Sequence, residues 1–139
     1  MGATAATGSA TTAARRDHVH NGIINSLQTT TVSGTRSDSA GAGDQAVTGA
    51  GFVPTAVIAF AEVHGQSRGT WGTADDSRAD FAIFSYPGFS HTGSLMFLDD
   101  GAGNWMGAVV KSYDADGLTL TWTKGSSGQN VDWTLFLMR

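Results

Sequence analysis

The clearest pattern in the chain is an alternation of apolar and polar residues near its end. Leu118, Leu120 and Trp122 alternate with threonines, and this period of two is typical of a strand with one buried face. In the last strand of the chain, Phe136 and Met138 place apolar side chains on the face opposite Leu135 and Leu137. A second subunit is the simplest cover for this additional apolar face. The predicted inner face of that closing strand carries Val131, Trp133, Leu135 and Leu137.

The rest of the second half predicts more strands and no helix. Residues 55–63 are apolar on both predicted faces, which indicates a central, buried strand. The segment Asp114-Ala115-Asp116-Gly117 matches a tight hairpin connection, and Gly107 predicts a weakened or bulged strand. Long loops are expected at 65–78 and 89–93. The remaining strands are expected at 79–86, 94–98 and 105–113.

This pattern predicts an all-β protein, with a β-sandwich or jelly-roll-like body and an extended N-terminal arm. The arm, residues 1–22, is of low complexity and is expected to be disordered alone in water, or ordered only by a partner surface. Residues 23–50 are expected to be a linker that holds a brief apolar anchor, a threonine-rich strand and at most a short strand near Val47. The sandwich domain is expected over 51–139.

Composition narrows the classes of partner. The chain has 8 Lys and Arg against 12 Asp and Glu, a net charge of −4, which gives no general attraction to nucleic acid or to an anionic membrane. Only 14% of the residues are charged, and such a surface is common where neighbouring subunits cover it. There is no cysteine, no secretory signal and no apolar run of membrane-spanning length, so we expect a soluble chain made in the cytoplasm.

Two histidines at the end of the arm are candidate metal ligands. His18 and His20 are two residues apart, so both imidazoles would face the same side of an extended strand. Three copies around a threefold axis would offer six imidazole nitrogens to one octahedral transition-metal ion. The alternative is that both side chains are simply solvated. A zinc site within one chain is disfavoured, because His64 and His91 are distant in sequence and no cysteine is present.

The same stretch carries a resemblance. Thr11-Thr12-Ala13-Ala14-Arg15-Arg16-Asp17-His18-Val19-His20 resembles a motif of tailed-bacteriophage fibre and appendage proteins, in which a small-residue lead runs into Ala-Arg-X-Asp-His-X-His. The resemblance implies iron binding by the histidines on a threefold axis. Proline often follows in that family, whereas this chain has Asn21-Gly22. The segments 51–58 and 113–122 and the closing strand are similar to β-rich domains of phage virion proteins.

No residue pattern predicts an enzyme. Ser90 and His91 are adjacent, which is the wrong spacing for mutual activation, and the aspartate pairs fall in predicted turns, where Asp commonly bonds the backbone. A carbohydrate-binding surface is the other candidate site, because sugars stack on aromatic rings. The alternative is that Trp105 lies in the core and Trp71 at an interface. The residues considered for that surface are Trp71, Phe89, His91 and Trp105.

Together these observations predict a structural phage virion protein, assembled in the host cytoplasm. A homotrimeric capsid decoration or cement protein bound to the major capsid protein or other virion proteins is the first expectation. The alternatives are a tail-fibre or tailspike tip that binds a receptor, and a lectin-like module that binds a host-surface glycan. No partner nucleic acid or membrane is expected, and no cofactor besides the metal. The expected attachment residues of the arm are Arg15, Arg16, Asp17, Ile23, Ile24 and Leu27.

Overall fold

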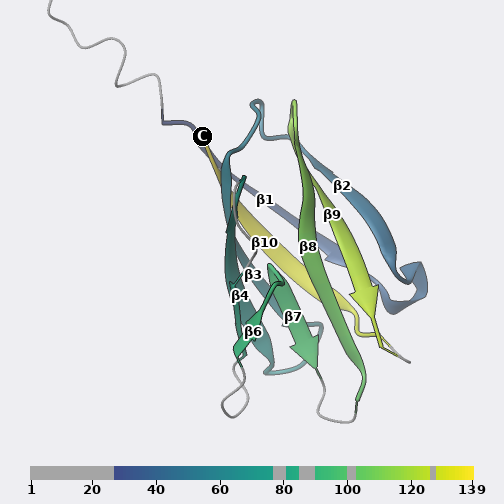
Figure 1. The fold of residues 1–139 in the computed structure, drawn as a ribbon. Coiled ribbons are helices and arrows are strands. Elements are labelled where there is room, and N and C mark those ends of the chain that lie inside the picture. The colour runs from purple at the N-terminus through teal and green to yellow at the C-terminus, as the bar shows by residue number, and fades with distance from the viewer. Residues whose placement is uncertain (1–26, 77–80, 85–89, 100–102, 126–127) are drawn as a thin grey trace, which may run out of the picture.

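A computed structural model describes residues 27–76, 81–84, 90–99, 103–125 and 128–139. Within these ranges the chain forms ten strands and one three-residue helix, arranged as two antiparallel sheets (Figure 1). The predicted all-β, sandwich-like class is confirmed. The arm, residues 1–22, lies outside the described residues.

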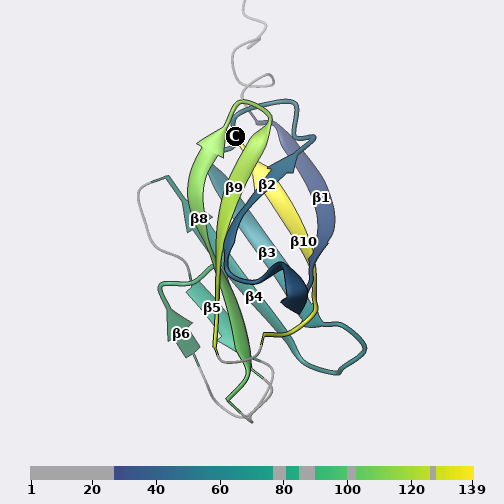
Figure 2. The same ribbon diagram turned by 90° about the vertical axis from the view of Figure 1, so that its right-hand side faces the viewer.

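The larger sheet has six strands in the order β1-β10-β3-β4-β5-β6. The last strand in sequence, β10, lies between β1 and β3, and β1 and β6 lie at opposite sides of the molecule (Figure 2). The bounds are β1 Thr29–Arg36, β10 Val131–Met138, β3 Ala56–Val63, β4 Gly69–Asp75, β5 Phe81–Phe84 and β6 Ser90–Thr92.

The smaller sheet has four strands in the order β2-β9-β8-β7. A short 3₁₀ helix, η1 (Asp38–Ala40), connects β1 of the first sheet to β2 of the second. The predicted hairpin is confirmed, because Asp114 of β8 pairs with Gly117 of β9. The bounds are β2 Gly43–Thr48, β9 Gly117–Lys124, β8 Trp105–Asp114 and β7 Met96–Asp99.

The core lies between the sheets and is built from the predicted alternation. Leu118, Leu120 and Trp122 of β9 are at most 1% exposed. Each fully buried Leu contributes about 1.5–3 kcal/mol through the removal of apolar surface from water. The four predicted inner residues of β10 are also buried: Val131, Trp133, Leu135 and Leu137.

The outer face of β3 differs from the prediction. We expected residues 55–63 to be buried on both faces, and β3 is indeed interior in the strand order. Val57, Ala59 and Ala61 point into the core, but Phe60 on the opposite face is 55% exposed. The reason is that the structure places no second layer over this face in the part of the chain that it describes.

The expected linker contributes to both sheets. Residues 29–36 pair with β10 along their whole length, and residues 43–48 pair with β9. The sequence predicts a threonine-rich strand and a short strand near Val47, but it does not show that they belong to the sheets, because β1 has a single large apolar residue, Val32, and its inner positions are otherwise Thr, Gly and Arg. A glycine suffices at residue 34 because the indole of the opposing Trp133 fills the space where its side chain would stand.

Two expected loops also contain strands. The segment 69–75, expected to be loop, forms β4, whose buried positions are Thr70, Gly72 and Ala74, too small to give an apolar signal. Residues 90–92 form β6 against β5. The irregularity of β8 lies at Lys111, between Val110 and Ser112, rather than at Gly107, which pairs regularly with β7.

Three aspartates fasten segments that are distant in the sequence to one another. Asp116 accepts the backbone N–H groups of Gly51 at 2.6 Å and Gly49 at 3.1 Å, which lower the pKa of its carboxyl group. The Lys124 ammonium donates to Asp38 Oδ1 at 2.7 Å, and the Gly128 N–H donates to the same oxygen. Both hydrogen bonds lower the pKa of Asp38, and the bond from Lys124 has the larger effect. Asp44 is held by Lys111 and by the Thr121 hydroxyl, and both lower its pKa.

Candidate functional site

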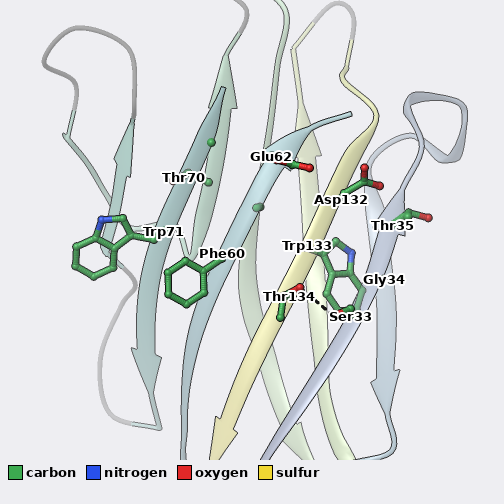
Figure 3. Close-up of a pocket in the computed structure, with 12 residues that line it drawn as sticks. Ser33, Gly34, Thr35, Phe60, Glu62, Thr70, Trp71, Asp132, Trp133 and Thr134 are labelled. Atoms are coloured by element: carbon green, nitrogen blue, oxygen red, sulfur yellow. Dashed lines mark hydrogen bonds between the residues drawn. The ribbon is translucent and has the colours of Figure 1, made fainter. Parts of the chain in front are cut away.

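An open hollow of about 880 Å³ lies on the outer face of the six-stranded sheet (Figure 3). Side chains on four adjacent strands, β1, β10, β3 and β4, surround it. The lining residues are Ser33, Gly34, Thr35, Phe60, Ala61, Glu62, Gly69, Thr70, Trp71, Asp132, Trp133 and Thr134.

One side of the hollow is an aromatic pair. Phe60 of β3 and Trp71 of β4 are direct cross-strand partners, and they are 55% and 42% exposed. Directly opposed side chains on an antiparallel pair have Cβ atoms about 4.5–5.5 Å apart. Figure 3 shows the two rings beside each other on one face of the sheet. Because both strands are interior, the pair forms a firmly supported apolar platform.

Hydroxyl groups continue the same cross-strand row. Thr134 of β10 lies opposite Phe60, and Ser33 of β1 lies opposite Thr134. The Ser33 and Thr134 hydroxyls share a hydrogen bond of 2.9 Å. The row Ser33, Thr134, Phe60, Trp71 therefore changes from polar to aromatic across four strands.

The neighbouring row is acidic. Asp132 lies opposite Glu62, and Glu62 lies opposite Gly69. Since Gly69 has no side chain, space remains beside Trp71 on the same face. The Nδ1 atom of His64 lies 2.6 Å from Oδ2 of Asp132 and orients that carboxylate.

This arrangement suits the binding of an uncharged ligand that has an apolar face and several hydroxyl groups. The carboxylates of Glu62 and Asp132 can accept hydrogen bonds, and the hydroxyls of the lining Ser and Thr residues can donate or accept them. The lining residues include no Lys or Arg to neutralise an anion. The hydroxyls of Ser33 and Thr134 bond each other, whereas His64 bonds Asp132. The hollow thus carries no paired nucleophile and base, and the expectation of a non-enzyme stays a prediction.

The structure does not bring the four predicted carbohydrate-surface residues together. Trp71 lies in the hollow, on a strand rather than in a loop. Trp105 lies on the outer face of the other sheet, where it stacks on Phe97 with a centroid distance of 5.3 Å and an interplanar angle of 24°. Trp71 and Trp105 therefore face opposite sides of the sandwich, and Trp105 is not in the core. The backbone of His91 belongs to β6, two strands from Trp71, and Phe89 lies outside the described residues.

Both predicted metal ligands and all but one of the predicted attachment residues lie outside the described residues. Leu27 is the first described residue, and it is 71% exposed. Among the described residues, no cluster of three or more His, Asp or Glu side chains could hold a metal ion. The His18 and His20 site therefore stays a prediction. The other residues that lie outside the described ranges are Arg15, Arg16, Asp17, His18, His20, Ile23 and Ile24.

Sequence reasoning missed most of the hollow. The sequence pattern predicts that Phe60 lies in a strand buried on both faces, and it indicates no role for Glu62 or Asp132. A signal was present, because Phe60 and Glu62 alternate with the small residues Ala59 and Ala61. Small residues inside and large ones outside indicate a strand whose outer face binds something.

No protein-family model matches the chain, and no curated protein and no solved structure is significantly similar to it. In the part of the chain that the structure describes, no helix is long and apolar enough to cross a membrane.

Proposed function

We propose that this chain is a non-catalytic glycan-binding module of a tailed-bacteriophage particle. The observation that carries the proposal is the exposed Phe60–Trp71 pair beside the carboxylates of Glu62 and Asp132. Large aromatic side chains exposed as neighbours on a rigid sheet are typical of a binding surface. The phage setting comes from the resemblance of residues 11–20 to the fibre motif.

A sugar ring matches the chemistry of both rows. Its C–H face packs on an aromatic ring, while its hydroxyls bond carboxylates and hydroxyls at the ring's edge. Because Glu62 and Asp132 carry negative charge and no cation lines the hollow, neutral sugars are favoured over sialylated ones.

The proposal is tested by titrating full-length protein with defined neutral oligosaccharides of glucose, galactose, mannose and N-acetylglucosamine, and with sialyllactose. Indole N–H signals in NMR spectra report binding. We expect at least one neutral sugar to shift the Trp71 signal, and Trp71→Ala to weaken binding about tenfold or more, as for loss of a stacking group that supplies roughly 1.4 kcal/mol.

Trp105→Ala is the matched control, since it removes the same side chain from the opposite face of the sandwich. It is expected to leave sugar binding unchanged. An equal loss of sugar binding in Trp71→Ala and Trp105→Ala contradicts the proposal, and so does a wild-type protein that binds none of the sugars. Thermal unfolding of both variants verifies that the fold is retained.

A capsid decoration or cement protein is the second candidate. The apolar outer face extends past the hollow to Phe136, which is 37% exposed and lies opposite Ile58. A capsid neighbour would bury this surface, and Phe136→Asp would then detach the protein from particles while leaving sugar binding intact. The number of copies per particle separates a decoration protein, present on the head lattice, from a fibre protein, present only at the tail.

A further inference from the structure

Strand β1 forms one edge of the six-stranded sheet. It pairs with β10 on one side, and within the described residues no strand pairs with its other side. The paired stretch is regular, with eight consecutive partners from Thr29–Met138 to Arg36–Val131. Such an edge is a template for one more strand.

The backbone hydrogen bonds reveal which residues of β1 face that open side. Gln28 and Arg139 exchange both of their backbone bonds, at 3.2 and 2.9 Å. The direction of the backbone N–H and C=O groups alternates along a strand. The even-numbered residues of β1 therefore bond β10, and the odd-numbered residues direct their N–H and C=O groups away from β10, within the plane of the sheet. The carbonyl of Thr35 confirms this direction, since it accepts a bond from Gln45 Nε2 on the β2 side. Thr29, Thr31 and Ser33 thus direct their N–H and C=O groups to the open edge.

The edge lacks the features that normally prevent pairing. Strands at sheet edges commonly carry a lysine, a proline or a bulge. The sequence of β1, Thr-Thr-Thr-Val-Ser-Gly-Thr-Arg, has none of them, and its regular register excludes a bulge. Its one charged residue, Arg36, is turned away, because its guanidinium donates to the Gly41 carbonyl at 2.8 Å.

We propose that β1 pairs antiparallel with β1 of a second copy of this chain, about a twofold axis at Thr31. In this register Thr31 lies opposite itself, Thr29 opposite Ser33, and Thr30 opposite Val32. Every outer-face pair joins two hydroxyls, which are favourable cross-strand partners, and no like charges meet. The three outward residues of each copy form about six backbone hydrogen bonds.

The symmetry has a consequence for the hollow. An antiparallel strand pair within one continuous sheet is related by an axis perpendicular to that sheet, so the outer faces of both copies lie on the same side. The two hollows then face one surface together. If the proposed glycan binding holds, the dimer binds a repeated glycan with higher avidity than the monomer.

The test is the mass of full-length protein by light scattering and sedimentation over a range of concentration. We expect a reversible dimer of twice 14.4 kDa. Thr31→Lys places two ammonium groups opposite each other at the axis and is expected to weaken the dimer at least tenfold. Thr73→Lys is the matched control, because Thr73 is an exposed threonine of interior strand β4. That variant is expected to remain dimeric.

Amide hydrogen exchange locates the contact. In the dimer the amides of Thr29, Thr31 and Ser33 are expected to exchange about tenfold or more slowly than in Thr31→Lys. The amides of Thr30 and Val32 bond β10 and stay protected in both proteins, which verifies that β1 is folded. Dilution of the wild type is expected to remove protection from the odd-numbered amides alone.

Four outcomes overturn the proposal. A monomer at every concentration excludes the contact, and a trimer excludes a twofold one. A dimer that survives Thr31→Lys places the interface elsewhere. Protection of Thr31 that does not depend on concentration assigns the edge to the chain's own N-terminal residues.

Discussion

Gly34 of β1 lies opposite Trp133 of β10, and the indole of Trp133 occupies the space where a side chain at residue 34 would stand. A Cβ atom built on Gly34 would come within 2.4 Å of the indole Cζ2 atom. The glycine is therefore required by close approach and not by an unusual backbone angle. The edge strand is held against the sheet by this contact.

Gly34→Ala is expected to lower the free energy of unfolding by about 1–3 kcal/mol, because the added methyl group overpacks a buried aromatic contact. Urea unfolding followed by tryptophan fluorescence measures the change. Thr35→Ala, the exposed neighbour, is expected to stay within about 0.5 kcal/mol of the wild type. Trp133→Phe combined with Gly34→Ala should recover part of the loss, and a fully additive pair would contradict the steric explanation.

The Asp116 carboxylate makes stability depend on pH at the acidic end. Backbone N–H groups of Gly51 and Gly49 lower its folded pKa below the ordinary value of 3.8. Its contribution is present at pH above the unfolded pKa and is lost as pH falls through the lowered folded pKa. Asp116→Asn is expected to lower the melting temperature at pH 7, and this difference should shrink below pH 4.

Asp38 and Asp44 also have lowered pKa values, so the wild type should lose further stability over the same acidic range. Carboxyl signals in NMR titrations report each aspartate separately. A melting-temperature difference for Asp116→Asn that persists unchanged through this range would show that shape, and not charge, accounts for the effect.

Phe97 and Trp105 form a stacked pair on the four-stranded sheet. A double-mutant cycle to alanine is expected to give a coupling of about 0.5–1.5 kcal/mol, as for other aromatic pairs. The cycle of Phe97 with Trp71 serves as the control, since those rings are on opposite faces and should be additive within about 0.5 kcal/mol. A coupling near zero for Phe97 and Trp105 would contradict the stacked geometry.

Neighbouring residues of β10 should respond very differently to truncation. Leu135 is 0% exposed, and Leu135→Ala is expected to cost about 2–5 kcal/mol through lost burial and a cavity. Phe136 is 37% exposed. Phe136→Ala removes more atoms than Leu135→Ala but leaves no closed cavity, so it is expected to lower the free energy of unfolding by less than about 1.5 kcal/mol. Urea unfolding of the pair tests the assignment of inner and outer faces, and a reversed order would contradict it.

The strands that could be predicted are those whose inner residues are large. Leu118, Leu120 and Trp122 signal both a strand and its buried face, and the turn before them carries Asp and Gly at suitable positions. In β4 the inner residues are Thr70, Gly72 and Ala74. That strand is fixed by its partners on both sides, which a local pattern cannot show.

The candidate site was predicted only in part for a related reason. Trp71 was singled out as a conspicuous aromatic, but its partner Phe60 is eleven positions away and was assigned to the core. Their contact depends on the register that places Phe60 against Trp71. Trp105 and Trp71 are the same kind of residue. They lie on opposite faces of the sandwich because β8 and β4 belong to different sheets, which the sequence pattern does not show.

The position of β10 between β1 and β3 constrains the order of folding. During synthesis β1 leaves the ribosome about a hundred residues before its only described sheet partner, and a contact so distant in sequence forms slowly. Until residue 138 has emerged, the threonine-rich strand has both edges open and β3 lacks one neighbour. The six-stranded sheet is therefore completed only after residues 131–138 have been synthesised, and a nascent chain stalled before residue 131 exposes unpaired strand edges, which are prone to aggregation.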